Sequence, residues 1–169
     1  MARGYPDARK GAIVPRDHHY QLDLVWTGNT GEGTSGYRTY RRDHEIRAEP
    51  GVLPGTADPF FRGVADRWNP EQLFLASLAQ CHLLTYLWLC VGAKVVVTDY
   101  RDSPTGVMQE EADGSGRFTG VTLRPHVTIS ADSDPEVALA LHDKVPDYCF
   151  IARSVSIPVH HEPTVVVAG

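Results

Sequence analysis

A nearly all-apolar helix with a strong start signal is the feature that most constrains the fold of this chain. Asn69 can cap the first free backbone N–H groups, and Pro70 suits the first helical position. Glu71 then places a negative charge at the positive end of the helix dipole. Apolar residues continue on every side of the helix as far as Leu89, so protein must cover it all round. Cys81, in the middle of this helix, is therefore expected inside the protein.

The same apolar run is a poor membrane span, because Gln80, His82 and Thr85 interrupt it and polar residues bound it. The chain has 169 residues, of which 42% are hydrophobic, and this suits one globular domain with a core. We expect residues 1–17 to form an N-terminal arm and residues 18–169 to form a single domain. A dimer would cover the central helix more easily than a monomer.

Charge and cysteine content limit the classes of partner and compartment. A net charge of -5 without a basic block offers no electrostatic footprint for nucleic acid. The N-terminal residues lack the pattern of a secretory signal, so export is not indicated. Three cysteines, an odd number, favour a reducing compartment over a disulfide framework. We therefore expect a cytoplasmic protein that binds neither nucleic acid nor membrane.

The rest of the chain predicts an α+β fold with helices on one side of antiparallel sheets. Alternating or β-branched runs predict strands at residues 19–26, 36–47, 93–100, 106–111, 118–131 and 157–167. The strands at 93–100, 106–111 and 118–131 are expected to form a meander. Residues 48–68, rich in Pro and Gly, are expected to form a long loop. A second helix is predicted from Asp134 to about Lys144, ended by Pro146, with a short helical piece at 148–155.

The chemical question is whether Cys81 and Cys149 form one site. Free cysteine is frequently a small buried hydrophobe, and this is the alternative for each of them. Cys149 follows Pro146 and is expected at the start of a helical turn, where free N–H groups would lower the pKa of its thiol. Cys90 lies roughly 13 Å from Cys81 along a straight helix and half a turn out of phase, so these two cannot bond. Cys90 is expected to fill the core.

Other candidate sites are weaker. His160 and His161 are adjacent in a predicted strand and point to opposite faces, so we expect no metal site there. His82 is turned by about 100° from Cys81 around the helix, so it is not automatically the base for that thiol. No phosphate loop, dinucleotide fingerprint or Ser-His-Asp context is present, and no cofactor is expected. Four aromatic residues could line an apolar pocket or belong to the core: Phe60, Phe61, Trp68 and Trp88.

The motif Asn-Pro-Glu-Gln-Leu at 69–73, followed by an apolar helix with Cys81, resembles the first motif of the osmotically inducible protein C and organic hydroperoxide resistance (OsmC/Ohr) family. Cys149 and the predicted strand at 157–167 stand where members carry a second cysteine and a closing strand. Phe150 replaces the Pro that usually follows this cysteine. The resemblance covers most of the chain from about His19. It implies an intertwined α+β homodimer, in which antiparallel sheets from both chains wrap around two central apolar helices.

The resemblance also implies a thiol-dependent peroxidase without metal, haem or flavin. In the family, a first cysteine attacks an organic or inorganic hydroperoxide as a thiolate, and a second cysteine resolves the sulfenic acid as a disulfide. These positions are Cys81 and Cys149. An external dithiol, on a lipoylated or thioredoxin-like protein, would return the electrons. The alternative is a dimer of this family without peroxidase turnover that binds a small apolar ligand or serves as an interaction module.

A buried thiolate needs a cation, and the family supplies an arginine held by a glutamate that matches Glu71. Arg62 is the expected arginine, although the segment between it and the motif is about one residue shorter than in the osmotically inducible branch. The earlier position used by the hydroperoxide resistance branch falls at residues 27–29, where no arginine stands. Arg38 and Arg67 remain substitutes. Any of these arginines could instead be a solvated surface charge, and Glu71 could simply complement the helix dipole.

Overall fold

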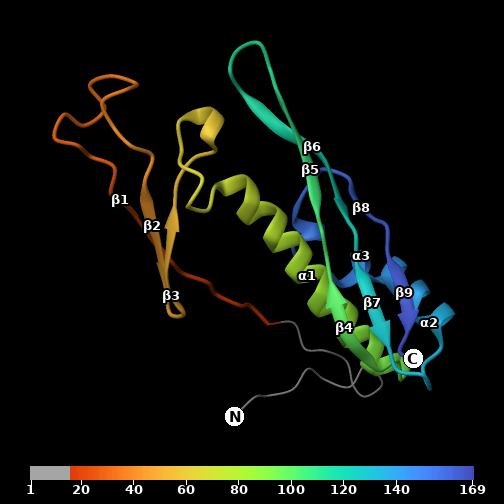
Figure 1. Cartoon of the computed structure of the whole chain (residues 1–169). Helices are drawn as coiled ribbons and strands as arrows, with labels where there is room; N and C mark the ends of the chain where they lie inside the picture. Colours follow the sequence, from red (N-terminus) through yellow and green to blue (C-terminus); the bar gives the residue numbers. More distant parts are fainter. Residues whose placement is uncertain (1–15) are drawn as a thin grey trace. The chain divides into compact units, whose positions relative to one another are not determined.

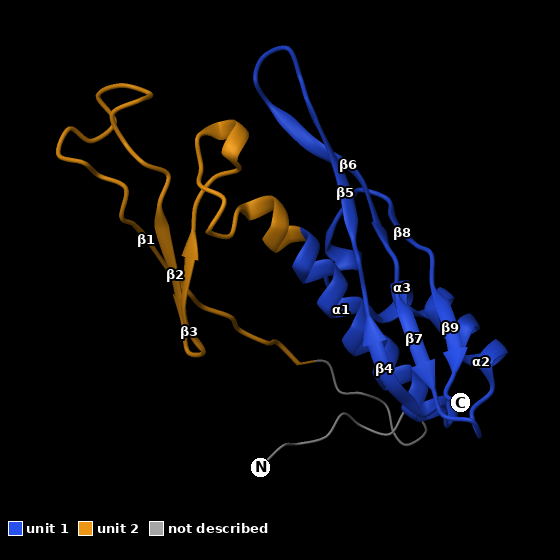
Figure 2. Cartoon of the chain, viewed as in Figure 1, with its two compact units in different colours: residues 1–11, 75–169 blue, residues 12–74 orange. Residues whose placement is uncertain are grey.

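The computed structural model describes residues 16–169, and these divide into two compact units (Figures 1 and 2). Unit 2 holds the described residues up to 74, and unit 1 holds residues 75–169. The long helix α1 (Pro70–Ala93) begins in unit 2 and continues in unit 1. The arm predicted for residues 1–17 lies outside the described residues as far as residue 15.

Unit 2 is built on a three-stranded antiparallel sheet in the order β1-β2-β3. Its strands are β1 (Asp23–Trp26), β2 (His44–Ala48) and β3 (Gly51–Gly55). The first two confirm the strands predicted around them, in shorter form. The predicted long loop at 48–68 was wrong, because this segment contains β3 and the 3-10 helix η1 (Pro59–Phe61). The apolar run of β3 is only two residues long between Gly and Pro, which is too short to give a strand pattern.

A capping box fixes the start of α1. The Asn69 Oδ1 atom accepts from the backbone N–H of Gln72 at 2.8 Å, and the Gln72 Oε1 atom accepts from the N–H of Asn69 at 3.2 Å. Pro70 is the first helical residue, which confirms the predicted start. At the other end, Lys94 adopts a left-handed conformation with φ 61°, and the N–H of Val95 donates to the carbonyl of Cys90.

Only one stripe of α1 is buried. It consists of Leu78, His82, Tyr86 and Cys90, which follow one another at four-residue spacing and so share one face. Leu84 and Val91 are 66% and 77% exposed. The expected cover on all sides of the helix is therefore absent from the described part of one chain. Among residues 16–169, α1 alone has the length and apolar composition to cross a bilayer, and the core helix of a soluble protein meets the same criterion.

Unit 1 contains two three-stranded sheets. The first has the order β4 (Val97–Arg101), β7 (His126–Ile129), β9 (Thr164–Val167). The second has the order β5 (Thr105–Glu110), β6 (Gly116–Leu123), β8 (Val159–His161). In each sheet the first two strands are antiparallel, and the third runs parallel to the middle strand. The sheets are therefore mixed, and the prediction of purely antiparallel sheets was right only in part.

The predicted meander was wrong, because β4 pairs with β7 and β5 pairs with β6. The strand predicted at 118–131 breaks around Pro125, and its two halves enter different sheets. The predicted closing strand at 157–167 breaks around Pro163 in the same way. A proline has no N–H for the ladder of hydrogen bonds, so each one marks the point where the chain leaves one sheet for the other.

Short helices complete unit 1. They are α2 (Pro135–Leu141), η2 (His142–Lys144), α3 (Val145–Tyr148) and η3 (Ala152–Ser154). The first two confirm the helix predicted at 134–144, and Asp134 caps it by accepting from the N–H of Glu136 at 2.9 Å. Pro146 does not end a helix as expected, because it lies in the first turn of α3, where its missing N–H costs nothing.

The core of unit 1 joins α1, β7, α2 and the end of α3. Its buried residues are Tyr86, Cys90, Val95, Val127, Ile129, Ala138, Val145 and Cys149. Cys81 packs against this cluster from α1. Both cysteines of interest therefore meet the same core, and Cys90 is part of it, as predicted.

Candidate redox site

Cys81 and Cys149 lie in contact in unit 1, and both are free thiols. Cys81 is partly buried on α1, whereas Cys149 follows α3 directly and is 1% exposed. The Cys81 thiol packs against the core cluster that contains Cys149, and this neighbour raises the pKa of Cys149.

Opposing influences act on the thiol of Cys149, and burial is the strongest. Burial, helped by the neighbouring Cys81 thiol, raises the pKa of Cys149 to about 12. The backbone N–H of Ala152, 3.4 Å from the sulfur, acts in the other direction but more weakly. The expectation that a helical start lowers this pKa was therefore wrong, because desolvation outweighs the nearby N–H groups. Cys149 remains a thiol at neutral pH.

A cavity of about 170 Å³ opens next to Cys149 within unit 1. Most of its wall is apolar: Leu78, Leu123, Val145, Pro146, Ala152, Ile157 and Val159. Two imidazoles, from His82 and His161, supply the polar part of the wall together with the Cys149 thiol. The aromatic residues considered as a pocket are placed elsewhere: Phe60 and Trp68 are 76% and 47% exposed, and Trp88 packs edge-on against Tyr148 at 5.2 Å.

Two of the histidines near this cavity are buried and paired with each other. The Nε2 atom of His82 lies 2.9 Å from the Nδ1 atom of His142, and the His142 ring stacks on Tyr86 at 3.9 Å. Burial lowers the pKa of His82 to about 4 and that of His142 to about 3, and the charge of His161 lowers both further. Both rings are therefore neutral at physiological pH.

The third histidine connects this pair to the surface. His161 lies with its Nε2 atom 3.0 Å from the Oδ1 atom of Asp143, and its ring centroid is 5.8 Å from that of His82. His160 is exposed on the other face of β8, as the adjacent positions predicted. This cluster of His82, His142 and His161 was not predicted from the sequence. The available signal was the position of His82, four residues from both Leu78 and Tyr86 on the buried stripe.

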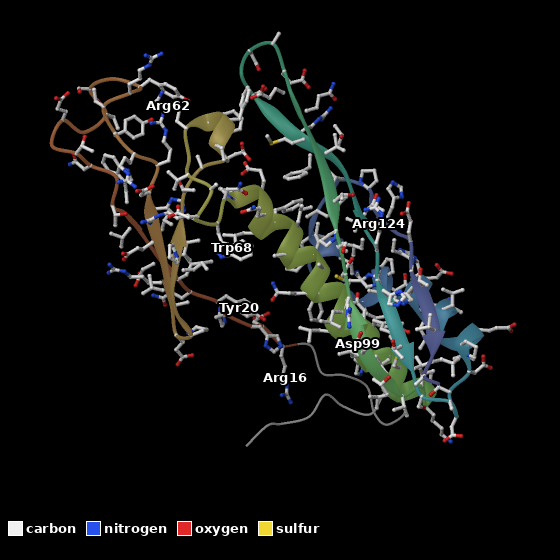
Figure 3. All side chains as sticks on the ribbon, viewed as in Figure 1. Arg16, Tyr20, Arg62, Trp68, Asp99 and Arg124 are labelled. Atoms are coloured by element: carbon white, nitrogen blue, oxygen red, sulfur yellow. The ribbon has the colours of Figure 1, made fainter. Side chains whose placement is uncertain are left out.

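The other two predicted site residues, Arg62 and Glu71, belong to unit 2. The side chain of Arg62 is labelled in Figure 3. Arg62 follows η1 in a left-handed conformation, φ 69°, and its guanidinium lies 5.9 Å from the ring of Tyr37. It lines a surface hollow together with Arg38 and Arg41. The Oε2 atom of Glu71 is buried and has no hydrogen-bond partner within residues 16–169. The expected bond between Arg62 and this oxygen is thus not formed in the described chain.

The fold and the site define a mixed α+β protein in which Cys81 and Cys149 share one core cluster and Cys149 lines a cavity with mostly apolar neighbours. A family model described as OsmC-like protein matches residues 63–163, which is more than half of the chain. The chain therefore belongs to the OsmC-like protein family. A sequence search of curated proteins finds no significant match.

Solved structures of several bacterial proteins share the fold. An OsmC-like protein of unknown function from Vibrio cholerae O1 biovar eltor is 26% identical, with a TM-score of 0.79, and the match covers 88% of this chain and all of that one. An organic hydroperoxide resistance protein OsmC from Legionella pneumophila is 19% identical, with a TM-score of 0.61 over 89% of this chain and all of that one. The organic hydroperoxide resistance protein OhrB of Bacillus subtilis is 20% identical, with a TM-score of 0.59, and the match covers 86% of this chain and 98% of that one.

Proposed function

We propose that this protein is a cysteine-based peroxidase that reduces organic hydroperoxides with Cys81 and Cys149. The contact between these two thiols is the observation that carries the proposal. A sulfenic acid condenses with a thiol only when the second sulfur is within reach, and Cys81 packs against the cluster that contains Cys149. The hydroperoxide resistance proteins among the structural relatives support the same chemistry.

The roles of the two cysteines follow from their surroundings. Cys149 is buried and protonated, whereas Cys81 is only partly buried on α1, so we assign the first attack to Cys81. Cys81 attacks the terminal oxygen of the hydroperoxide, so that an S–O bond forms, the O–O bond breaks and an alcohol leaves after taking up a proton. Cys149 then attacks the Cys81 sulfenic acid, which forms the disulfide and releases water.

The cavity beside Cys149 suits a small organic substrate. Its volume of about 170 Å³ compares with roughly 150 Å³ for an engineered apolar cavity that binds benzene. A compact alkyl or aryl hydroperoxide fits such a space, and its hydrocarbon part would meet the aliphatic wall. We propose that this cavity receives the organic part of the substrate.

The active form is proposed to be a homodimer. Exposed apolar side chains on α1 and β1 need cover, notably Leu84, Val91, Leu24 and Trp26, which are 44% to 77% exposed in one chain. The unpartnered Oε2 atom of buried Glu71 also needs a donor. We propose that dimer formation covers these surfaces, and that an arginine, with Arg62 as first candidate, then binds Glu71 and stabilises the Cys81 thiolate.

The remaining parts of the proposal concern the reaction cycle in the cell. The disulfide is reduced by an external dithiol, on a lipoylated or thioredoxin-like protein. The odd number of cysteines favours the cytoplasm. No nucleic acid, membrane, metal or cofactor enters the cycle.

Thiol counting after one equivalent of cumene hydroperoxide tests the proposal. Wild type should lose two thiols, and a second addition after dihydrolipoamide should lose two again. Cys81→Ser should lose no thiols on the time scale of the wild-type reaction. Cys149→Ser should form a sulfenic acid that dimedone traps. Cys90→Ser is the matched control and should behave like wild type. Retention of all thiols in wild type would rule out the peroxidase.

The mainly aliphatic wall of the cavity also favours a second candidate, a dimer that binds a small apolar ligand without turnover. In that case an apolar probe such as 1-anilinonaphthalene-8-sulfonate should bind equally well to wild type and Cys81→Ser, and wild type should not turn over peroxide with dihydrolipoamide or thioredoxin.

A further inference from the structure

His161 occupies a position that the proposed peroxidase cycle has not used. It lines the same cavity as Cys149, and its Nε2 atom lies 3.0 Å from the Oδ1 atom of Asp143. The His161 side chain is 19% exposed and that of Asp143 is 79% exposed. One imidazole thus connects the inside of the cavity to a carboxylate at the surface.

The contact with Asp143 determines which nitrogen of His161 can accept a proton. A carboxylate beside Nε2 favours the tautomer with hydrogen on Nε2, and this leaves Nδ1 as the acceptor. A base held by a third group is the usual arrangement for activating a cysteine or serine. The cavity that His161 and Cys149 both line has room for a water molecule, which takes about 30 Å³ of the roughly 170 Å³ present.

We propose that His161, oriented by Asp143, is the proton acceptor that activates Cys149 when this thiol attacks oxidised Cys81. This inference rests on the proposed peroxidase function and adds a residue to its second step. Cys149 is buried and needs help in that step, because its proton must leave as its sulfur bonds to Cys81.

The step balances within the site. The S–H proton of Cys149 moves to Nδ1 of His161, directly or through one water, and the Cys149 sulfur forms the S–S bond with Cys81. The S–O bond of the sulfenic acid breaks, and the leaving hydroxide takes the proton from His161 to become water. Neither an oxidant nor a reductant beyond the bound hydroperoxide is consumed.

The groups around His161 leave it as the proton acceptor of the histidine cluster. Asp143 faces it from η2, and the buried rings of His82 on α1 and His142 on η2 lie 5.8 Å and 6.5 Å away, centroid to centroid. Burial disfavours a positive charge on both of these rings, so neither competes with His161 as the proton acceptor. Cys149 is the remaining titratable group on the cavity wall, and the neighbouring Glu162 is paired with Arg124 at 2.9 Å.

A single-turnover experiment separates the two chemical steps. The full-length protein is mixed with one equivalent of cumene hydroperoxide, Cys81 sulfenic acid is trapped with dimedone, and disulfide is followed by mass spectrometry. His161→Gln should slow disulfide formation about 100-fold more than it slows formation of the sulfenic acid, because a general base typically contributes 10²–10⁴-fold. Asp143→Asn should slow the same step to a smaller extent.

A pH profile distinguishes proton transfer from a structural effect. The wild-type rate of disulfide formation should fall on the acidic side, where His161 is protonated, and His161→Gln should lose this dependence. His160→Gln, on the exposed face of the same strand, is the matched control and should keep the wild-type rate and profile. If His161→Gln loses its fold by circular dichroism, Asp143→Asn decides, since its carboxylate is at the surface.

The two proposals fail in different ways. Disulfide formation at the wild-type rate and with the wild-type pH profile in His161→Gln, or in a folded Asp143→Asn when the first variant is unfolded, would overturn the role of His161 alone. A wild-type protein that forms neither sulfenic acid nor disulfide would overturn the peroxidase and this inference with it.

Discussion

Cys81 packs against the core cluster that contains Cys149, although the two residues lie 68 positions apart in the chain. One sulfur belongs to a long helix, and the other follows a single-turn helix that packs into the same core. The two sulfurs have unequal surroundings, and burial keeps Cys149 protonated. A partly buried thiol and a fully buried one therefore lie in one cluster before any oxidant arrives.

Oxidation should join Cys81 to Cys149 and leave Cys90 reduced. Cys90 is 2% exposed, and burial raises the pKa of its thiol to about 11, so it reacts slowly with any electrophile. Peptide mapping after one equivalent of cumene hydroperoxide should find the disulfide between residues 81 and 149 alone. A linkage through Cys90 would contradict the geometry, and Cys90→Ser should give the same map as wild type.

Removing the N-terminal cap of α1 should lower the stability of the folded protein. Asn69→Ala removes the acceptor of the Gln72 N–H and should lower the free energy of unfolding by about 1 kcal/mol. Asn69→Ser keeps an acceptor oxygen and should recover most of this loss. Urea denaturation measures both, with the exposed Gln80→Ala in the same helix as the control. Equal stability of the Ala and Ser variants would show that the cap contributes nothing.

The buried hydroxyl of Tyr86 should contribute to the stability of unit 1. It donates to the carbonyl of Ala138 at 3.1 Å, and both residues are fully buried. Tyr86→Phe should therefore lower the free energy of unfolding by about 1 kcal/mol without changing the packing of the ring on His142. Tyr148→Phe, at a half-exposed position, should change it by less than about 0.5 kcal/mol. A similar effect of both variants would argue against this hydrogen bond.

Acid should destabilise the protein through its buried histidines. The pKa of His82 falls from 6.5 to about 4 on folding, so the unfolded chain binds more protons than the folded one between these values. Stability is then fully present above about pH 6.5 and is lost as the pH falls, by about 2 kcal/mol between pH 8 and pH 5. The lowered pKa of His142 acts in the same direction.

Urea midpoints at pH 8, 6.5 and 5 check this pH dependence. His82→Gln should lower the free energy of unfolding at pH 8. It should also reduce the loss of stability between pH 8 and pH 5, because glutamine has no imidazole that takes up a proton on unfolding. His160→Gln should keep the wild-type slope, since this side chain is exposed. An unchanged slope in His82→Gln would mean that other groups control the acid response.

Local sequence signals predicted where the main helices begin. The pairing of the strands could not be predicted, because it depends on segments far apart in the chain. Asn69 and Pro70 predicted the start of α1, and Asp134 predicted α2, because a cap acts within one turn. The parallel pairing of β8 and β9 with distant strands leaves no periodic trace in either segment. The sequence shows Pro125 and Pro163 within the predicted strands. That the chain changes sheets at these prolines depends on strands elsewhere in the chain.

The candidate site, too, could be predicted only in part from the sequence. The family motif identified Cys81 and Cys149 as candidates, and the structure brings their sulfurs together. The direction of the pKa shift of Cys149 could not be predicted, because it depends on how much protein covers the sulfur. The histidine cluster was missed since its members come from α1, η2 and β8, and only folding assembles them.

The last eleven residues supply an edge strand to both sheets of unit 1, through β8 and β9. A protease that removed residues 159–169 would expose the backbone of β6 and β7 together and would take His161 away from Asp143. Exposed strand edges pair readily with other chains. Trimming of the tail would thus turn this protein toward aggregation and disable its proton transfer in a single event.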